Sequence, residues 1–528
     1  MKLNRRMAGV AIVLSILLPH PGWAVTPANT LVIAKNIDDV ISLDPGEAYE
    51  ASGGEIITNV YDRLIRFEAD DVKKLVGGVA ESWTVSQDGR TLTFKLRPGL
   101  KFQSGDPVTA EDAAFSLQRV VLLDKTPSFL LTQFGWTKDN VAQNIKASDP
   151  STLVLTLQVD FAPSLVLNVI SSTIGAVVDK KVVMDHAAVG DLGNGWLKNH
   201  AAGSGAFTLR SWTPNESVVL EASPGFRLGA PKLARVVVRH VPEAAAQRLL
   251  LEKGDVDIAR NLTADQLKGL DTNEFPVLTQ GSADSFYVAL NQNEPHLADP
   301  KVREAMRWLI DYQGMADSFL KGQFTIHQSF LPSSFWASLP ENPYKLDVTK
   351  AKALLAEAGY PDGFAISMDA FNSAPWSSIA QSIQSTMAQG GIKISILPAE
   401  QKQVWTKFRA RGHQMLLIQW SPDYLDPNSN SDTFCHNTDN SDTSKARTVA
   451  WRNHWFIPEL SKASDEASRE KDSTKREADY IFLQKQLLSD SPYLFMFEPI
   501  YAIASRKNVK DFVVGPYWDL VFYRLVSK

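Results

Sequence analysis

The sequence predicts an α/β protein divided into at least two lobes. At 528 residues the chain is longer than one hydrophobic core usually serves. Segments in which apolar and polar residues alternate are typical of strands with one buried face, and they recur between segments that have the period of an amphipathic helix. Strands interleaved with helices favour α/β lobes over an all-α or an all-β fold.

The strand pattern is clearest in three places. TLTFKL begins at residue 91, TLVLTLQV at residue 152 and GIKISIL at residue 391, and in each the apolar side chains fall on every second position. A period of two places these side chains on one face of a strand. The three segments are therefore predicted strands.

Helix signals lie between such strands. Thr109 can cap a helix over 110–121 with Asp112 as the capping-box acid, and Asp299-Pro300 opens a second helix. Two more helices are predicted over 243–251 and 351–358, ending at Gly254 and Gly359. The segment 426–444 is rich in Asp, Asn, Ser and Thr, which predicts a surface loop.

The first 24 residues have the organisation of a secretory signal peptide. Lys2, Arg5 and Arg6 precede an apolar run over 7–18, and Gly22 and Ala24 frame a small-x-small cleavage site. Cleavage is expected after Ala24, with the mature chain in a periplasm. The formal net charge of −5 becomes more negative once this basic segment is removed, so nucleic acid is an unsuitable partner.

No catalytic or metal-binding constellation stands out in the sequence. HExxH, paired CxxC, Walker A and GxSxG motifs are absent. Cys435 is the only cysteine, which excludes an intramolecular disulfide, and Cys435-His436 lacks the further ligands that a metal site needs. We expect no metal and no cofactor. The 25 Phe, 13 Trp and 12 Tyr residues suit a protein that closes two lobes over a small ligand.

Five blocks in order carry a resemblance to a known family. The longest is AESWTVSQDGRTLTFKLRPGLKFQSGDPVTAEDAAFSLQRV, at 80–120. The others are GSGAFTLRSWTPNESVVLEA at 203–222, LARVVVRHVPEAAAQRLLLEKGDVDIA at 233–259, VREAMRWLID at 302–311 and DVTKAKALLAEAGYPDGF at 347–364. Together they resemble bacterial extracellular solute-binding protein family 5, the periplasmic binding proteins of peptide, nickel and opine ABC importers.

The resemblance implies a two-lobed periplasmic binding protein fold of type II, cluster C. The first lobe is expected over 25–68, 195–283 and 498–528, with an inserted subdomain over 69–194, and the second lobe over 284–497. Two hinge crossings are expected at 285–293 and 495–503. The resemblance also implies a monomer that binds a short peptide or peptide-like amine between its lobes and delivers it to an inner-membrane ABC permease.

Peptide-binding members of the family have a WxxDY-like stretch whose aspartate anchors the ligand's α-ammonium. Trp420-Ser421-Pro422-Asp423-Tyr424 matches it, so Asp423 is the candidate anchor and Trp420 and Tyr424 its neighbours at the ligand. The alternative is that Asp423 only forms a turn. Asp426 is expected to be structural.

The segment 43–64 resembles the first-lobe stretch whose backbone pairs with an extended peptide. It places Tyr49, Glu50 and Ala51 at the ligand. For Glu50 the alternative is a solvated surface acid.

The chain also departs from the family. Some dipeptide-binding relatives hold the ligand carboxylate with an arginine in a stretch resembling 371–381, where this sequence has Trp376 and serines. Trp136, Arg452 and Trp455 mark either a subgroup's ligand or packing. An opine, a sugar conjugate or a metal chelate remains an alternative ligand, and a secreted hydrolase using Asp423 and Asp426 is the alternative from another class.

Overall fold

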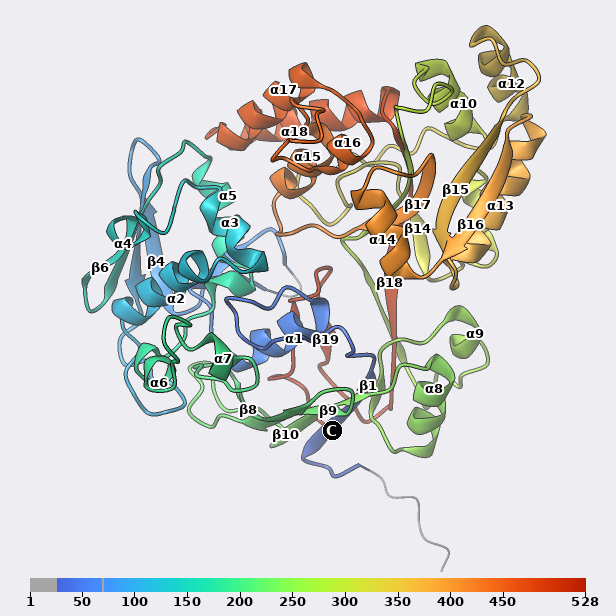
Figure 1. Cartoon of the computed structure of the whole chain (residues 1–528). Coiled ribbons are helices and arrows are strands. Elements are labelled where there is room, and N and C mark those ends of the chain that lie inside the picture. The colour runs from blue at the N-terminus through green and yellow to red at the C-terminus, as the bar shows by residue number, and fades with distance from the viewer. Residues whose placement is uncertain (1–25, 69–70) are drawn as a thin grey trace, which may run out of the picture.

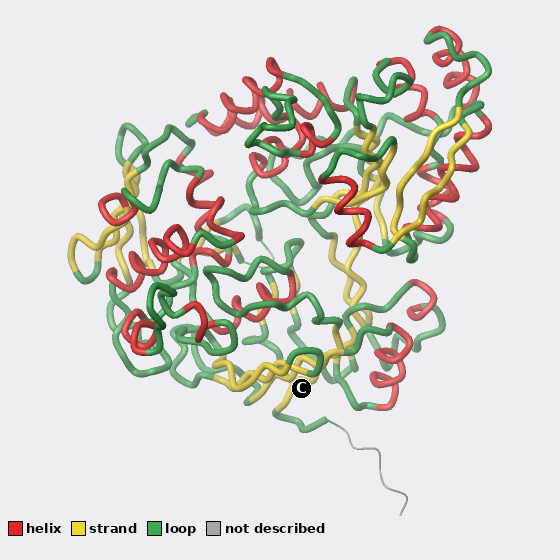
Figure 2. Tube along the Cα trace, in the orientation of Figure 1, coloured by secondary structure: helices red, strands yellow, loops and turns green. Residues whose placement is uncertain are grey.

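A computed structural model describes residues 26–68 and 71–528. The predicted signal segment lies outside these residues. In the described part of the chain, twelve strands form one mixed sheet in the order β16-β15-β17-β13-β18-β11-β1-β10-β9-β8, while β12 and β14 pair with β18 (Figures 1 and 2). The sheet extends through two lobes, so one strand must join them.

That joining strand is β18 (Tyr493–Ser505). Its first half pairs with β13 (Ser285–Leu290), where Tyr493 faces Ala289, and its second half pairs with β12 (Val277–Gly281), where Ala504 faces Val277. Residues 282–284 connect β12 to β13 and form the neighbouring passage between the lobes. A hinge built from a long strand beside a short connection allows the lobes to rotate with little loss of pairing.

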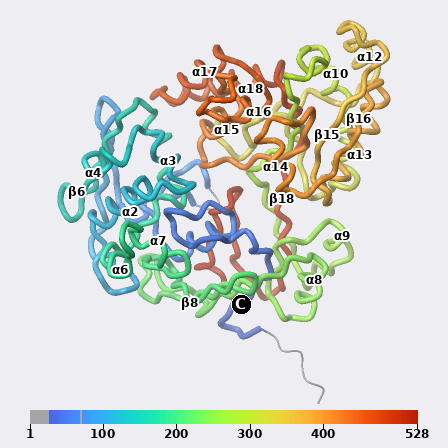
Figure 3. Tube along the Cα trace, viewed as in Figure 1, coloured from blue at the N-terminus to red at the C-terminus, as the bar shows by residue number. Residues whose placement is uncertain are grey.

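The first lobe is built from both ends of the chain. In Figure 3 the blue N-terminal and red C-terminal segments lie together in the lower part of the molecule, and Asn59 Nδ2 donates to the Val521 carbonyl at 2.8 Å. Its other strands are β1 (Thr30–Lys35), β8 (Phe207–Thr213), β9 (Ser217–Ala222), β10 (Arg235–His240), β11 (Ile258–Ala259), β19 (Val513–Val514) and β20 (Val521–Phe522). Its helices include α1 (Ala51–Val60), α6 (Lys180–Asp185), α7 (Asn194–Leu197), α8 (Ala244–Lys253) and α9 (Ala264–Leu267).

A subdomain with its own core stands beside the first lobe, on the left of Figure 1. It contains the sheet β4-β5-β7-β6, formed by β4 (Ala80–Val85), β5 (Thr91–Leu96), β7 (Thr152–Thr156) and β6 (Ile145–Asp149). The helices α2 (Ala110–Leu123), α3 (Phe129–Thr132), α4 (Val141–Asn144) and α5 (Pro163–Ile170) belong to it. The short hairpin of β2 (Ile65–Phe67) and β3 (Leu75–Gly77) leads into the subdomain.

The second lobe covers its half of the sheet with helices on both faces. The remaining strands are β14 (Phe324–Ile326), β15 (Ala365–Phe371), β16 (Lys393–Ala399) and β17 (Met415–Trp420). The helices are α10 (Pro300–Trp308), α11 (Tyr312–Asp317), α12 (Val348–Glu357), α13 (Trp376–Gln389), α14 (Gln401–Arg409), α15 (Pro427–Cys435), α16 (Val449–Arg452), α17 (Pro458–Arg469) and α18 (Ser473–Ser489). The arrangement confirms the α/β expectation, while the predicted lobe boundaries stay predictions.

The predicted helix ends are largely confirmed. Thr109 and Asp112 form the expected capping box of α2, and the Asp299 side chain caps α10. α8 ends at Gly254, which has a left-handed conformation with φ 83°. α12 begins three residues before the predicted start because the Asp347 side chain caps it. Within the described residues, no helix is long and apolar enough to cross a membrane.

The prediction of a surface loop over 426–444 is wrong for the first half of that segment. Residues 427–435 form α15, and most of its polar side chains are buried. They are accommodated because they bond to one another and to nearby groups: Ser431 Oγ lies 2.8 Å from Ser464 Oγ, and Asn430 Nδ2 donates to the Phe330 carbonyl at 2.6 Å. The composition predicted contact with solvent, but internal hydrogen bonds satisfy most of these polar groups instead.

Candidate functional site

Asp423 lies where the two lobes meet. β17 ends at Trp420, and Asp423 follows three residues further. Its carboxylate accepts a hydrogen bond from the hydroxyl of Tyr49, which lies two residues before α1 of the first lobe. The hydroxyl of Tyr517, in the C-terminal segment, donates to the Asp423 backbone carbonyl at 2.9 Å. Two first-lobe tyrosines therefore contact one aspartate of the second lobe.

The Asp423 carboxylate has no cationic partner among the described residues. Burial raises its pKa to about 6, and the nearby charge of Asp432 acts in the same direction. The Tyr49 hydrogen bond and the charge of Arg452 lower that pKa, but not enough to offset burial. A half-buried carboxylate with a raised pKa and no counter-ion is a favourable place for a cationic guest.

Asp426 fixes the loop that carries Asp423. Its carboxylate accepts from Arg476 Nη2 at 2.6 Å, from Asn168 Nδ2 at 2.8 Å and from the Asn428 backbone N–H at 2.9 Å, which caps α15. The residue is 0% exposed. This confirms its structural role, and it removes the second carboxylate that the hydrolase alternative requires.

Of the two predicted neighbours of Asp423, Tyr424 is a packing residue and Trp420 lies at the site. Tyr424 is 3% exposed and packs in the subdomain core, so it joins the lobes rather than facing an open cavity. Trp420 is half-buried with its ring edge-on to Phe434, and its indole N–H has no hydrogen-bond partner. An unpaired donor beside an unpaired carboxylate is consistent with a site that a polar guest completes.

The three first-lobe candidates adjoin this position differently. Tyr49 touches Asp423 directly, while the half-buried Glu50 carboxylate accepts from the Tyr49 backbone N–H at 3.1 Å. Burial raises the pKa of Glu50. Ala51 is exposed at the start of α1 and lines a pocket of about 180 Å³ with Arg260, Tyr501, Trp518 and others.

A buried ion network forms one wall of that pocket. Glu55 pairs with Lys35 at 2.5 Å and with Arg260 at 2.7 Å. Burial alone would raise the pKa of Glu55, but the charges of Arg260 and Lys35 lower it to about 2. These groups are already neutralised, so Glu55 is not a free anion for a ligand.

The structure places two predicted tryptophans in cores. Trp136 is 0% exposed, and its indole N–H donates to the Thr156 carbonyl at 2.8 Å inside the subdomain, so the prediction that it contacts ligand is replaced by the packing alternative. Trp376 is 8% exposed at the start of α13, stacked on Phe286 with ring centroids 4.3 Å apart. Trp376 is therefore chiefly a second-lobe packing residue.

The site also contains polar groups that sequence reasoning did not identify. Asp284, in the passage between the lobes, accepts from Ser282 Oγ at 2.8 Å, and burial raises its pKa. Ser285 and Tyr287, on β13, have buried hydroxyls without a partner. No local motif marks these residues, because they meet β17 only through sheet pairing.

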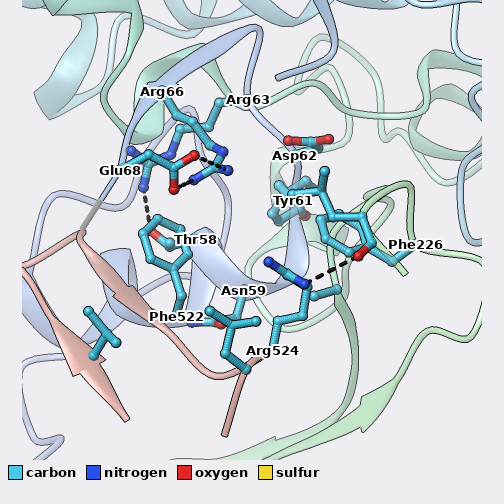
Figure 4. A pocket seen from close by; sticks show the side chains of 14 residues that line it. Thr58, Asn59, Tyr61, Asp62, Arg63, Arg66, Glu68, Phe226, Phe522 and Arg524 are labelled. Atoms are coloured by element: carbon cyan, nitrogen blue, oxygen red, sulfur yellow. Dashed lines mark hydrogen bonds and ion pairs between the residues drawn. The ribbon is translucent and has the colours of Figure 1, made fainter. Parts of the chain in front are cut away.

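A second pocket of about 180 Å³ lies apart from Asp423, between α1, β2 and β20 (Figure 4). Its charged lining is largely paired within the protein: Arg66 with Glu68 at 2.9 Å, and Arg63 with Asp519 at 2.9 Å. Because these charged groups already have partners, the pocket has few free charges to bind a polar ligand. The Asp423 carboxylate, by contrast, has no cationic partner among the described residues.

Comparison with known proteins places this architecture in a family. The profile of bacterial extracellular solute-binding proteins, family 5, matches residues 74–442. The probable D,D-dipeptide-binding periplasmic protein DdpA of Escherichia coli K12 is 30% identical over 518 residues, covering 97% of this chain and 96% of that protein. The chain belongs to family 5 of the bacterial extracellular solute-binding proteins.

Solved structures agree with the fold. The periplasmic binding protein DppA of Helicobacter pylori, in complex with the peptide STSA, aligns with a TM-score of 0.77 at 23% identity, covering 94% of this chain and 98% of that one. The binding protein MoaA of A. tumefaciens R10, in complex with mannopinic acid, aligns with a TM-score of 0.75 at 25% identity, covering 94% and 99%. The fold is that of the two-lobed periplasmic binding proteins.

Proposed function

We propose that this protein captures a short peptide or peptide-like amine between its lobes in the periplasm and delivers it unchanged to an inner-membrane ABC permease. The observation that carries the proposal is the half-buried Asp423 carboxylate between the lobes, which has no cationic partner within residues 26–68 and 71–528. An α-ammonium group would supply the missing charge. The E. coli relative named for D,D-dipeptides makes short peptides the first ligands to test.

Closure of the lobes explains how such a guest is held. Tyr49 and Tyr517 of the first lobe reach Asp423 of the second, so the anchor is complete only when the lobes are together. Enclosure strengthens the ion pair, since the interaction between two charges grows as water is excluded. A guest that pairs with Asp423 therefore favours the closed state over the open one.

The test is a binding screen followed by an anchor variant. Dipeptides of both chiralities, glutathione and mannopinic acid are screened by thermal shift, because a ligand that binds only the folded state raises the melting temperature. For each binder, Asp423→Asn should weaken binding at least tenfold, about 1.4 kcal/mol. Asp265→Asn, at an exposed position on α9, is the matched control and should change nothing.

Two outcomes would contradict the proposal. A binder whose affinity is the same in Asp423→Asn would remove Asp423 as the anchor. Recovery of chemically altered ligand after incubation would contradict a pure binding role. Export is tested separately: N-terminal sequencing of the protein from a periplasmic extract should begin after Ala24.

A further inference from the structure

The pocket between α1, β2 and β20 is small and separate from Asp423 (Figure 4). Its volume of about 180 Å³ is below the roughly 300–1,000 Å³ that is typical of sites for drug-sized ligands. Its lining comes from α1 and β2, from the loop that contains Phe226, and from the C-terminal segment that contains Phe522 and Arg524. Because none of the lining residues comes from the second lobe, the pocket does not depend on how the two lobes close.

One part of the lining is apolar and incompletely covered. Leu228 is 41% exposed and Leu525 is 39% exposed, and both line the pocket. The rings of Phe226 and Phe522, which also line it, are half-buried. Single exposed apolar residues are ordinary on a protein surface, but several around one cavity are typical of a place where an apolar group binds.

Most charged groups of the lining already have a partner of opposite charge. The pairs are Arg63 with Asp519 at 2.9 Å, Arg66 with Glu68 at 2.9 Å, and Asp62 with Arg227, whose Nη2 donates to Asp62 Oδ1 at 3.1 Å. These pairs neutralise each other. A charged guest therefore has to find its counter-ion elsewhere in the lining.

Arg524 is the exception among these charged groups. Its guanidinium donates to the Leu228 carbonyl at 3.2 Å, and no carboxylate pairs with it within residues 26–68 and 71–528. That hydrogen bond occupies one of the five N–H donors of the side chain. Burial lowers the pKa of Arg524 and the nearby charge of Arg66 acts in the same direction, while the charge of Glu68 opposes them.

The free cation and the apolar surface lie together. Leu525 follows Arg524 directly in the chain, and the Leu228 carbonyl accepts from the Arg524 guanidinium. Arg66 lies over the ring of Phe522, 5.3 Å from its centroid, so a second guanidinium borders the same cavity. The pocket thus combines apolar walls with one positive charge that lacks a counter-ion.

A small amphipathic anion complements this combination. A planar carboxylate matches the guanidinium fork, and a single negative charge balances the single uncompensated cation. We propose that this pocket is a second binding site, for a small monocarboxylate whose carboxylate group pairs with Arg524 and whose apolar body covers Leu228, Leu525 and the neighbouring rings. This site goes beyond the proposed function, because it shares no residue with the position of Asp423 between the lobes.

The experiment compares small acids with their uncharged amides. Benzoate and hexanoate are titrated by calorimetry into the purified protein beside benzamide and hexanamide. At least one acid should bind with a Kd of about 1 mM or tighter, and at least tenfold more tightly than its amide. Arg524→Gln should remove this preference. Leu525→Asp places a competing carboxylate beside Arg524 at an exposed position and should weaken the acid at least tenfold.

Controls locate the binding and decide the outcome. Arg235→Gln removes an exposed cation that pairs with Glu221 elsewhere in the first lobe, and it should preserve the preference for the acid. Failure of both acids to bind, or equal binding of acids and amides, would overturn the inference. So would an undiminished preference in folded Arg524→Gln or, if that variant does not fold, in Leu525→Asp. None of these outcomes affects the proposed capture of peptides, because Asp423 is not part of the pocket.

Discussion

The hydroxyl of Tyr49 in the first lobe donates a hydrogen bond to the carboxylate of Asp423 in the second lobe, across 374 positions of sequence. The bond uses one of the several acceptor positions of the carboxylate and supplies no charge. Asp423 can therefore keep Tyr49 and still pair with an ammonium group. This hydrogen bond therefore depends both on lobe closure and on the protonation state of the Asp423 carboxylate.

Ligand affinity should depend on pH through Asp423. Its pKa of about 6 in the free protein means that the carboxylate is protonated below that value and cannot pair with an ammonium group. Affinity for an amine-bearing ligand is expected to fall roughly tenfold per pH unit below about pH 6 and to level off above pH 7. Calorimetry between pH 5 and pH 8 measures it, and a flat profile would contradict the anchor role.

The same carboxylate should destabilise the ligand-free protein at neutral pH. Because the folded pKa is raised above the usual 3.8, the folded state favours the protonated form, so this contribution to stability is present below about pH 4 and is lost as pH rises through about 6. Asp423→Asn should then raise the free energy of unfolding by on the order of 1 to 3 kcal/mol at pH 7 and leave it unchanged near pH 4. Urea unfolding at the two pH values tests the difference; equal shifts at both would speak against a charge effect.

Tyr49→Phe should move the pH dependence rather than abolish binding. The Tyr49 hydrogen bond lowers the pKa of Asp423, so its removal raises that pKa further. The midpoint of the affinity profile is expected to shift to higher pH, while stability changes by only about 1 kcal/mol. An unshifted midpoint would mean that the hydroxyl does not contact the carboxylate in solution.

Arg476→Met should lower the stability of the protein at the loop that carries Asp423. It leaves the fully buried Asp426 charge without its partner, which typically costs about 3 to 5 kcal/mol. Denaturant titration provides the free energy of unfolding. Lys301→Met breaks the exposed pair with Glu357 and serves as the control, with a change within about 0.5 kcal/mol.

Gly54→Ala should disturb the site through the C-terminal segment. A Cβ at Gly54 would lie 1.6 Å from the Trp518 ring, next to Tyr517, whose hydroxyl bonds to the Asp423 carbonyl. Overpacking of this kind costs about 1 to 3 kcal/mol, and ligand affinity should fall with it. Gly225→Ala enters open space and should preserve both melting temperature and affinity.

Local sequence patterns predicted what local interactions determine. The capping box at Thr109, the cap at Asp299 and the turn at Gly254 each involve residues a few positions apart, and all three formed as expected. The loop prediction for segment 426–444 failed because the composition of the segment is typical of a loop. Asp426-Pro427 is, however, also a signal for the start of a helix. Burial of that helix depends on partners such as Ser464 and Phe330, which no local pattern reveals.

The sequence by itself determined the α/β class, the family and the position of Asp423, because alternation, helix caps and the WxxDY stretch are all short-range features. Only the tertiary structure decided what surrounds that aspartate. Packing between segments far apart in the sequence brings the hydroxyls of Tyr49 and Tyr517 to it. Desolvation of a carboxylate depends on all the residues that surround it in space. Residues far apart in the sequence carry no local signal that they will come together.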